Sequence, residues 1–259
     1  MDAREFYDAL GSDYDRMVSW EQRLVREQEF FRQVFSEAGA KRVLDAACGT
    51  GMHAISFARA GWDCTAADLS PVMVEKAREN ARIAGVAVRF ETAAFGELSS
   101  RVGAGFDAVT CLGNSLPHLL DDAALQACLG DFAHLLVPGG TLVIQNRNYD
   151  RLLRERQRFM PPVSRAEEDG ETVFLRITEF PAPGARNDEA VSFTIVTLRK
   201  RGAAWAMTER TTPLRALRRA TLEGALDRAG FTSVRAYGSY AFEPFDSPGT
   251  ADLVLIARR

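Results

Sequence analysis

Short apolar runs and longer stretches of helical spacing alternate through the first half of the chain. Three stretches have the spacing of amphipathic helices: 53–60, 71–84 and 123–136. Five apolar runs have the length and composition of strands: 42–46, 63–68, 87–92, 106–112 and 141–146. Because strands that alternate with helices form parallel sheets, we predict an α/β fold with a doubly wound, Rossmann-like sheet.

The residues before and after this region follow other patterns. Residues 1–40 have helical character, and Gly39 is a typical stop signal. Beyond residue 150, three β-rich runs follow one another without helices between them: 172–180, 190–200 and 204–212. They predict an antiparallel sheet inserted after the fifth strand as a lid or platform. A helix over 219–229 and two closing strands, 233–240 and 251–257, complete the pattern.

We therefore predict four parts. They are an N-terminal helical cap (1–40), a Rossmann-like core (41–150), an inserted antiparallel β subdomain (151–212), and a C-terminal helix with the closing strands of the core (213–259).

The composition narrows the possible partners. The 259 residues are 46% hydrophobic, enough for a large core, and the formal net charge is −3. This balance gives no electrostatic reason to bind nucleic acid or an anionic membrane, and no apolar run is long enough to span a bilayer. The four cysteines form no CxxC pair, so we expect no metal site. We expect a soluble, cytoplasmic protein, and leave open whether it forms a homo-oligomer.

A glycine loop follows the first predicted strand. The segment D-A-A-C-G-T-G covers residues 45–51, and a second acid, Asp68, ends the next strand. Strand, glycine loop, helix, strand and acid form the plan of a nucleotide-binding βαβ unit. The loop lacks the third glycine of a dinucleotide site and the lysine of a phosphate-binding loop. A nucleoside ligand without phosphates remains, with Asp68 placed to accept from ribose hydroxyls. The alternative is a structural turn with an incidental acid.

This pattern resembles the S-adenosylmethionine site of class I methyltransferases. The resemblance implies this methyl donor, with S-adenosylhomocysteine as product, and a Pro138-Gly139-Gly140 turn before the fifth strand. It places Ala94 and Phe95 beside the adenine, although a lone aromatic residue can equally belong to the core. In this core the implied donor-binding residues are Asp45, Ala47, Gly49, Gly51, Asp68, Leu69, Ala94, Phe95 and Leu112.

Two further motifs follow the fourth and fifth predicted strands. C-L-G-N-S-x-x-H-L begins at Cys111, and V-I-x-x-R-N-Y-D begins at Val143. Together they resemble the glycine N-methyltransferase family and its glycine/sarcosine relatives, over about residues 41–152. In that family these positions hold a small amino acid beside the donor. The implied catalytic residues are Asn114, His118, Arg147 and Tyr149, and Asn114 also contacts the donor.

The resemblance assigns particular roles, each with a plainer alternative. Arg147 would pair with the acceptor carboxylate, because a guanidinium matches two oxygens; otherwise it is a surface arginine. Asn114 could instead be a turn residue, His118 a capping residue, and Tyr149 part of the core. From the N-terminal segment, Tyr14 and Arg23 would reach over the donor, with the arginine on its methionine carboxylate. The alternative for both is a solvated helix face.

Two departures from the family bear on the acceptor. Its eukaryotic members have Asn-Trp where this chain has Ala94-Phe95, and the tyrosine-rich stretch that helps to bind glycine is absent from 161–169. Glycine itself is therefore in doubt. We expect an S-adenosylmethionine-dependent N-methyltransferase acting on a small amino acid or amine such as glycine, sarcosine or dimethylglycine. The alternatives are an O-methyltransferase acting on another small metabolite and a non-catalytic donor-binding domain.

Overall fold

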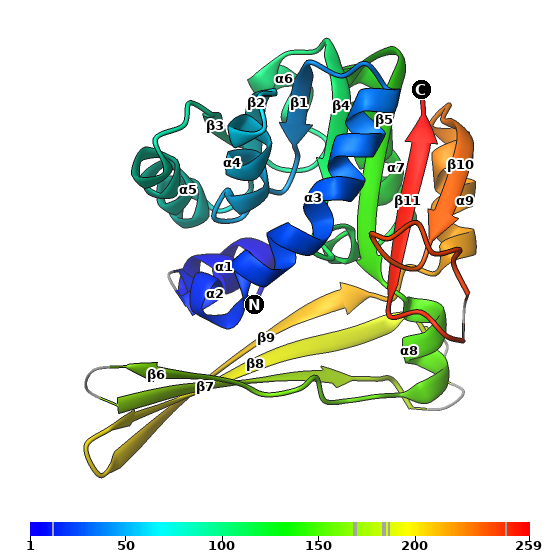
Figure 1. The fold of residues 1–259 in the computed structure, drawn as a ribbon. Helices are drawn as coiled ribbons and strands as arrows, with labels where there is room; N and C mark the ends of the chain where they lie inside the picture. The colour runs from blue at the N-terminus through cyan, green and yellow to red at the C-terminus, as the bar shows by residue number, and fades with distance from the viewer. Residues whose placement is uncertain (12, 168–169, 183–184, 186, 247) are drawn as a thin grey trace.

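Seven strands form the larger of two sheets in the computed structural model, which describes residues 1–11, 13–167, 170–182, 185, 187–246 and 248–259 (Figure 1). The strand order is β10-β11-β5-β4-β1-β2-β3, with β11 antiparallel to both of its neighbours. The predicted Rossmann-like sheet is thus confirmed. The strands are β1 (Arg42–Asp45), β2 (Asp63–Asp68), β3 (Arg89–Thr92), β4 (Phe106–Cys111), β5 (Leu136–Arg147), β10 (Thr232–Tyr237) and β11 (Asp252–Arg258).

Helices cover both faces of this sheet, as expected for a doubly wound fold. One face packs against α3 (Trp20–Glu37), α4 (Met52–Arg59) and α5 (Pro71–Ala84). The other packs against α6 (Leu98–Val102), α7 (Asp122–Leu135) and α9 (Arg219–Arg228). The bounds of α5 match the prediction because both of its ends are fixed locally. The Ser70 hydroxyl accepts from the Met73 N–H, and Gly85 ends the helix in the left-handed conformation.

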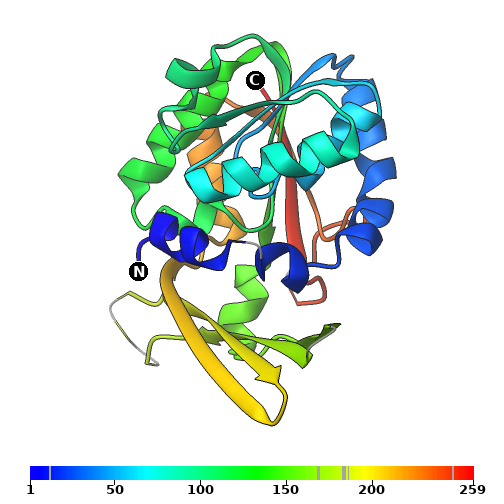
Figure 2. The same ribbon diagram turned by 90° about the vertical axis from the view of Figure 1, so that its left-hand side faces the viewer.

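The seven-stranded sheet and the helices on its two faces form what we call the domain. Two short N-terminal helices, α1 (Ala3–Leu10) and α2 (Asp13–Met17), lie between this domain and the second sheet (Figure 2). Their buried side chains Phe6, Leu10 and Met17 pack against Met73 of α5 and against the second sheet. The helical character predicted for residues 1–40 is therefore divided among three helices. The first two join the two parts of the molecule.

The second sheet has four antiparallel strands in sequence order. Three were predicted, and β6 was missed, because its five residues include Ser164 and Arg165 and lack an apolar run. At the base of this insertion the Asp150 carboxylate accepts from the Arg219 N–H at 3.1 Å, so the chain leaves and re-enters the domain at adjacent points. The strands are β6 (Val163–Glu167), β7 (Gly170–Glu179), β8 (Ala190–Arg201) and β9 (Ala204–Arg215).

Several local predictions need correction. The strand β5 begins at Leu136, before the expected Pro138-Gly139-Gly140 turn, and its pairing with β4 shifts register across this segment. Three short elements carry no distinct sequence pattern and were missed: α6, the 3-10 helix η1 (Leu116–His118) and α8 (Tyr149–Glu155). Within the stretch 161–169 lacking tyrosines, residues 168 and 169 lie outside the described part of the chain. In the part that is described, no helix is long and apolar enough to cross a membrane.

Candidate active site

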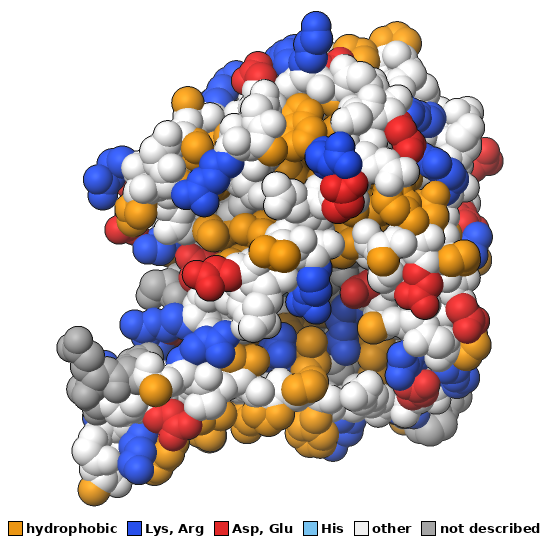
Figure 3. All heavy atoms as spheres, viewed as in Figure 1, with side chains coloured by type: hydrophobic (Ala, Val, Ile, Leu, Met, Phe, Trp, Pro, Cys, Tyr) orange, Lys and Arg blue, Asp and Glu red, His pale blue; other side chains and the backbone are white. Residues whose placement is uncertain are grey.

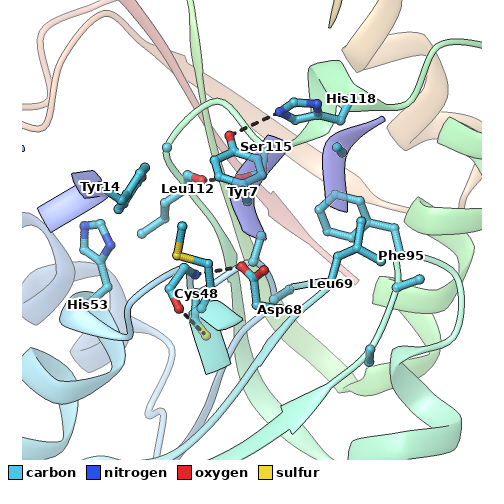
Figure 4. Close-up of a pocket in the computed structure, with 18 of the residues that line it drawn as sticks. Tyr7, Tyr14, Cys48, His53, Asp68, Leu69, Phe95, Leu112, Ser115 and His118 are labelled. Carbon is cyan, nitrogen blue, oxygen red and sulfur yellow. Dashed lines mark hydrogen bonds between the residues drawn. The ribbon is translucent and has the colours of Figure 1, made fainter. Parts of the chain in front are cut away.

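Two adjoining cavities lie beyond the carboxyl ends of β1, β2, β4 and β5. The inner cavity, of about 210 Å³, is formed mainly by the loops that follow β1, β2, β3 and β4 (Figure 4). The outer cavity, of about 730 Å³, lies between the domain, the N-terminal helices and the four-stranded sheet. Open α/β sheets place their ligands at this edge. Five residues line both cavities and form what we call the shared wall: Tyr7, Tyr14, Arg23, Gly113 and His118.

The glycine loop is fixed by its own backbone. The Cys48 N–H donates to the Ala67 carbonyl at 2.9 Å, and Gly49, with φ of +52°, turns the chain along the inner cavity. Gly51 has another role, because a Cβ there would lie 2.8 Å from the Cβ of Ala77. Gly51 therefore permits close packing of α4 and α5 and does not line the cavity.

Asp68 lines the inner cavity with a carboxylate already oriented by the backbone. One of its oxygens accepts from the Gly49 N–H at 2.8 Å, and the other accepts from the Ser70 N–H at 2.9 Å. Burial raises the pKa of Asp68 to about 6, although these two N–H groups act in the opposite direction. A carboxylate oxygen accepts two hydrogen bonds, so each retains one acceptor position.

Asp45 lies beneath the loop, outside the inner cavity. It is 1% exposed, and one oxygen accepts from the Thr110 hydroxyl at 3.2 Å. The other oxygen has no hydrogen-bond partner among the described residues, and burial raises the pKa of this carboxyl. Asp45 therefore contacts Thr110 of β4 beneath the glycine loop and does not line the cavity.

Five further predicted residues of the inner cavity have apolar side chains. Ala47, Leu69, Ala94, Phe95 and Leu112 all line it, as their predicted positions require. Phe95 also packs edge-to-face on the buried Phe132, with ring centroids 5.9 Å apart. Phe95 is thus both a cavity residue and a neighbour of the core, so the two interpretations of it are compatible.

Neutral polar groups dominate the shared wall. The Tyr7 hydroxyl and His118 Nε2 lie 3.2 Å apart, within hydrogen-bonding distance. Burial lowers the pKa of His118 to about 4 and raises that of Tyr7 above its ordinary value. Both side chains are therefore uncharged at neutral pH.

The cationic residue of the wall is Arg23, which is held by a buried network. Its Nε donates to Glu27 at 2.7 Å, and the second carboxylate oxygen of Glu27 lies 2.7 Å from His53 Nε2. Burial opposes ionisation of Glu27, but His53 and Arg23 outweigh this effect and lower its pKa. The guanidinium of Arg23 also lies 5.3 Å from the centre of the Trp20 ring.

The two strand-end motifs meet in the outer cavity, which both Asn114 and Arg147 line. The Asn114 side chain accepts from the Arg147 N–H at 3.0 Å and donates to the Tyr149 hydroxyl at 3.0 Å. Tyr149 is 1% exposed and lines neither cavity. It therefore supports Asn114 from behind, which agrees with its interpretation as a core residue.

The structure adds lining residues that the sequence patterns did not identify. Tyr7 is one of them, and it lies with Tyr14 in the shared wall. The other additions have no motif, because they come from separate elements of the chain. They include Trp20, His53 and Met73 in the inner cavity, and Met160, Arg176, Phe193 and Ile195 in the outer cavity. Ser115, which belongs to the motif that begins at Cys111, also lines the inner cavity.

The part of the chain that forms most of the inner cavity matches a known protein family. Residues 43–140, which supply most of its lining, match the family described as a methyltransferase domain. The chain contains a class I S-adenosylmethionine-dependent methyltransferase domain. The CcbJ methyltransferase from Streptomyces caelestis has the same fold as the whole chain, with a TM-score of 0.78, 22% identity, and coverage of 100% of this chain and 99% of that one.

Two relatives of this methyltransferase domain differ in the acceptor atom that their names imply. The glycine/sarcosine N-methyltransferase of Halorhodospira halochloris is 37% identical over 149 residues, 58% of this chain and 56% of that protein. The ubiquinone biosynthesis O-methyltransferase of Xanthomonas axonopodis pv. citri (strain 306) is 39% identical over 121 residues, 46% of this chain and 48% of that protein. The chain therefore spans about half the length of these relatives, and identity over the domain does not by itself select nitrogen or oxygen.

Proposed function

We propose that this protein is an S-adenosylmethionine-dependent N-methyltransferase whose acceptor is a small amino acid or amine, with glycine, sarcosine and dimethylglycine as first candidates. One observation carries the proposal. The inner cavity of the methyltransferase domain and an outer cavity containing Arg147 share a wall, so donor and acceptor can meet there. The glycine/sarcosine relatives support nitrogen as the acceptor atom.

The residues of the inner cavity fit the donor. The free acceptor positions of Asp68 match a pair of vicinal hydroxyls, such as those of a ribose. Leu69, Ala94 and Phe95 offer apolar contact to a purine, and Arg23 offers a guanidinium to a carboxylate. When bound, S-adenosylmethionine supplies a methyl group on a positively charged sulfur. We assign its binding to these residues and to the backbone of Ala47, Gly49 and Leu112.

The chain's contribution to methyl transfer is alignment and exclusion of water. Arg147 would hold an acceptor carboxylate, Asn114 would position the acceptor, and the shared wall would keep the amine in line with the methyl group. The new N–C bond forms as the C–S bond breaks, and the S–C electron pair leaves with the thioether product.

The proton of the amine needs no dedicated base in this scheme. An amine that arrives unprotonated attacks through its lone pair, and the proton of the product ammonium passes to solvent. His118, whose pKa is about 4, is neutral and can accept a hydrogen bond from the amine, but it would hold a full proton poorly. We therefore assign His118 an orienting role.

The direct test is release of S-adenosylhomocysteine. Purified protein is incubated with the donor and a panel of amines that includes glycine, sarcosine, dimethylglycine and larger amino acids. Product formation that depends on an amine supports the proposal. Donor binding by calorimetry without turnover on any acceptor would instead support a non-catalytic donor-binding domain.

A second candidate is an O-methyltransferase, favoured by the 39% identity to the ubiquinone biosynthesis enzyme. The same assay, extended to phenols and carboxylic acids, separates the two. Turnover confined to oxygen acceptors would replace the N-methyltransferase proposal.

A further inference from the structure

A second arginine faces the outer cavity from the inserted sheet. Arg147 Nη1 donates to the Thr178 hydroxyl on β7 at 3.1 Å, and Arg176 lies two residues earlier on the same strand. Because alternate side chains of a strand point to the same face, Arg176 and Thr178 project together. Both arginines line the outer cavity. Figure 3 shows Lys and Arg side chains along the hollow between the upper and lower parts of the molecule.

Arg147 and Arg176 have no carboxylate partners of their own among the described residues. Neither forms an ion pair with another described residue, and the buried Nε of Arg176 has no hydrogen-bond partner among them. The Arg176 Nη2 donates to the Pro161 carbonyl at 3.2 Å. Burial, and then the charge of Arg147, lower the pKa of Arg176.

Two carboxylates line the same cavity, but both are engaged elsewhere. Glu27 is bound by Arg23 and His53. Asp252 lies opposite Arg147 in the register of β11 and β5, and its carboxylate accepts from the Gln145 amide at 2.9 Å. If Glu27 is counted against Arg23 and Asp252 against Arg147, the positive charges of Arg176 and of the exposed Arg26 remain. An anionic group on a ligand would balance the charge of Arg176.

The outer cavity is much larger than glycine, and part of its lining is apolar. Met160, Phe193, Ile195 and Leu214 line it, all contributed by the insertion. A volume of about 730 Å³ falls in the range of roughly 300–1,000 Å³ that is typical of sites for drug-sized ligands. The cavity therefore suits a ligand that has an anionic group for the two guanidinium groups and an apolar part that packs on the inserted sheet.

We propose that the acceptor is an amine larger than glycine, with a carboxylate bound between Arg147 and Arg176 and an apolar side chain against Phe193 and Ile195 of β8 and Leu214 of β9. This inference rests on the proposed function and makes Arg176 a specificity-determining residue. In its simplest form the acceptor is an apolar α-amino acid.

Calorimetry on the protein saturated with S-adenosylhomocysteine tests the inference without turnover. The probes are glycine, leucine and phenylalanine, each beside its primary amide, which lacks the carboxylate. We expect leucine or phenylalanine to bind at least tenfold more tightly than glycine and than its own amide. Equal binding of acid and amide, or tightest binding of glycine, would overturn the inference.

Variants of Arg176 test whether this residue causes the preference for acid over amide. In Arg176→Gln the preference for acid over amide should fall by about tenfold, whereas Arg176→Lys should retain part of it. The matched control is Arg158→Gln, which removes an exposed cation of the insertion that lines neither cavity. Its acid preference should be unchanged, as should the affinity of all three variants for S-adenosylhomocysteine. An undiminished acid preference in Arg176→Gln would remove the role of Arg176.

The outcomes separate this inference from the proposed function. Acid-selective binding with no methylation of any amine would refute the N-methyltransferase proposal alone. Methylation of amines in which acids and amides have the same KM would refute the anionic acceptor alone.

Discussion

The two cavities are built in different ways, although they share a wall. The inner cavity takes most of its lining from the loops of one βαβ pattern and the strand beside it, within residues 46–119. The outer cavity collects side chains from the N-terminal helices, the ends of β4 and β5, the insertion and the segment that leads to β11. The family match at residues 43–140 covers most of the first and leaves most of the second outside.

Most of the inner cavity is therefore formed by the region that matches the methyltransferase-domain family, and most of the outer cavity by residues outside it. A loop that must admit one donor has little freedom, because Gly49, Asp68 and the backbone hydrogen bonds between them define one shape. The following substitutions should affect one cavity, the other, or both.

The largest effect should come from Glu27, which holds the arginine common to both cavities. Glu27→Ala leaves Arg23 and His53 without their buried partner, and such changes cost about 3–5 kcal/mol of unfolding free energy. Chemical denaturation measures this loss, and donor affinity and acceptor KM should both worsen. Glu29→Ala, on the exposed side of the same helix, serves as the control and should leave the denaturation midpoint unchanged. A stable Glu27→Ala protein would contradict this account of the wall.

Removal of the Asp68 carboxylate should affect the inner cavity alone. Hydrogen bonds to a charged group contribute about 1.5–3 kcal/mol, so Asp68→Ala should weaken S-adenosylhomocysteine binding by roughly 10- to 100-fold. Calorimetry measures the change. Asp63→Ala, at the exposed start of the same strand, is the matched control and should bind normally. Normal binding by Asp68→Ala would exclude its proposed contact with the donor.

Arg147 should affect the outer cavity alone. In Arg147→Gln the KM of a carboxylate-bearing acceptor should rise by about tenfold or more, because a charge-assisted contact is lost. The donor affinity should not change. Arg151→Gln removes a neighbouring cation that lines neither cavity, and its steady-state kinetics should match the wild type. Equal losses of donor and acceptor binding in Arg147→Gln would contradict the separation of the two cavities.

Donor binding should depend on pH through Asp68. Its pKa is raised to about 6 by burial, and only the ionised carboxylate offers all of its acceptor positions. Affinity for S-adenosylhomocysteine should therefore be constant above pH 7 and fall as pH decreases through 6, approaching tenfold per unit. Asp68→Asn should bind weakly at every pH with a flatter profile. An unchanged slope in this variant would assign the titration to another group.

The smallest effect is expected at His118. Burial lowers its pKa to about 4, so the imidazole is already neutral across the assay range and does not act as a general base. The kcat of His118→Gln should fall by less than about tenfold, with the same pH dependence as the wild type. Loss of a rate inflection between pH 4 and 7 in this variant would show that His118 exchanges a proton during turnover.

The sequence predicted the fold and the inner cavity because both depend on local pattern. Asp68 ends one parallel strand, Ala94 and Leu112 follow two others, and the carboxyl ends of such strands meet at one edge. The same logic overestimated Gly51 and Asp45. A glycine in a motif can serve helix packing, as the 2.8 Å approach to Ala77 requires, and spacing does not distinguish that role from ligand contact.

The outer cavity was only partly predictable, since its members are brought together by tertiary packing. Asn114 and Arg147 were found through motifs, but Arg176 lies on a strand where charged residues are ordinary. The contact between Glu27 and His53 joins residues 26 positions apart on two helices, and neither residue has a sequence signal. Such residues are identified only when the packing of α3 on α4 and of the insertion on the domain is known.

The hydrogen bond between Asp150 and the Arg219 backbone has a practical consequence for engineering. It joins the two points at which the insertion leaves and re-enters the domain, so residues 151–218 form a cassette with neighbouring ends. Chimeras that exchange this cassette between relatives would transfer Arg176 and the apolar residues that the insertion contributes to the outer cavity. The glycine loop and Asp68 would stay in place. Methylation of new acceptors could thus be obtained by grafting, without redesign of the donor site.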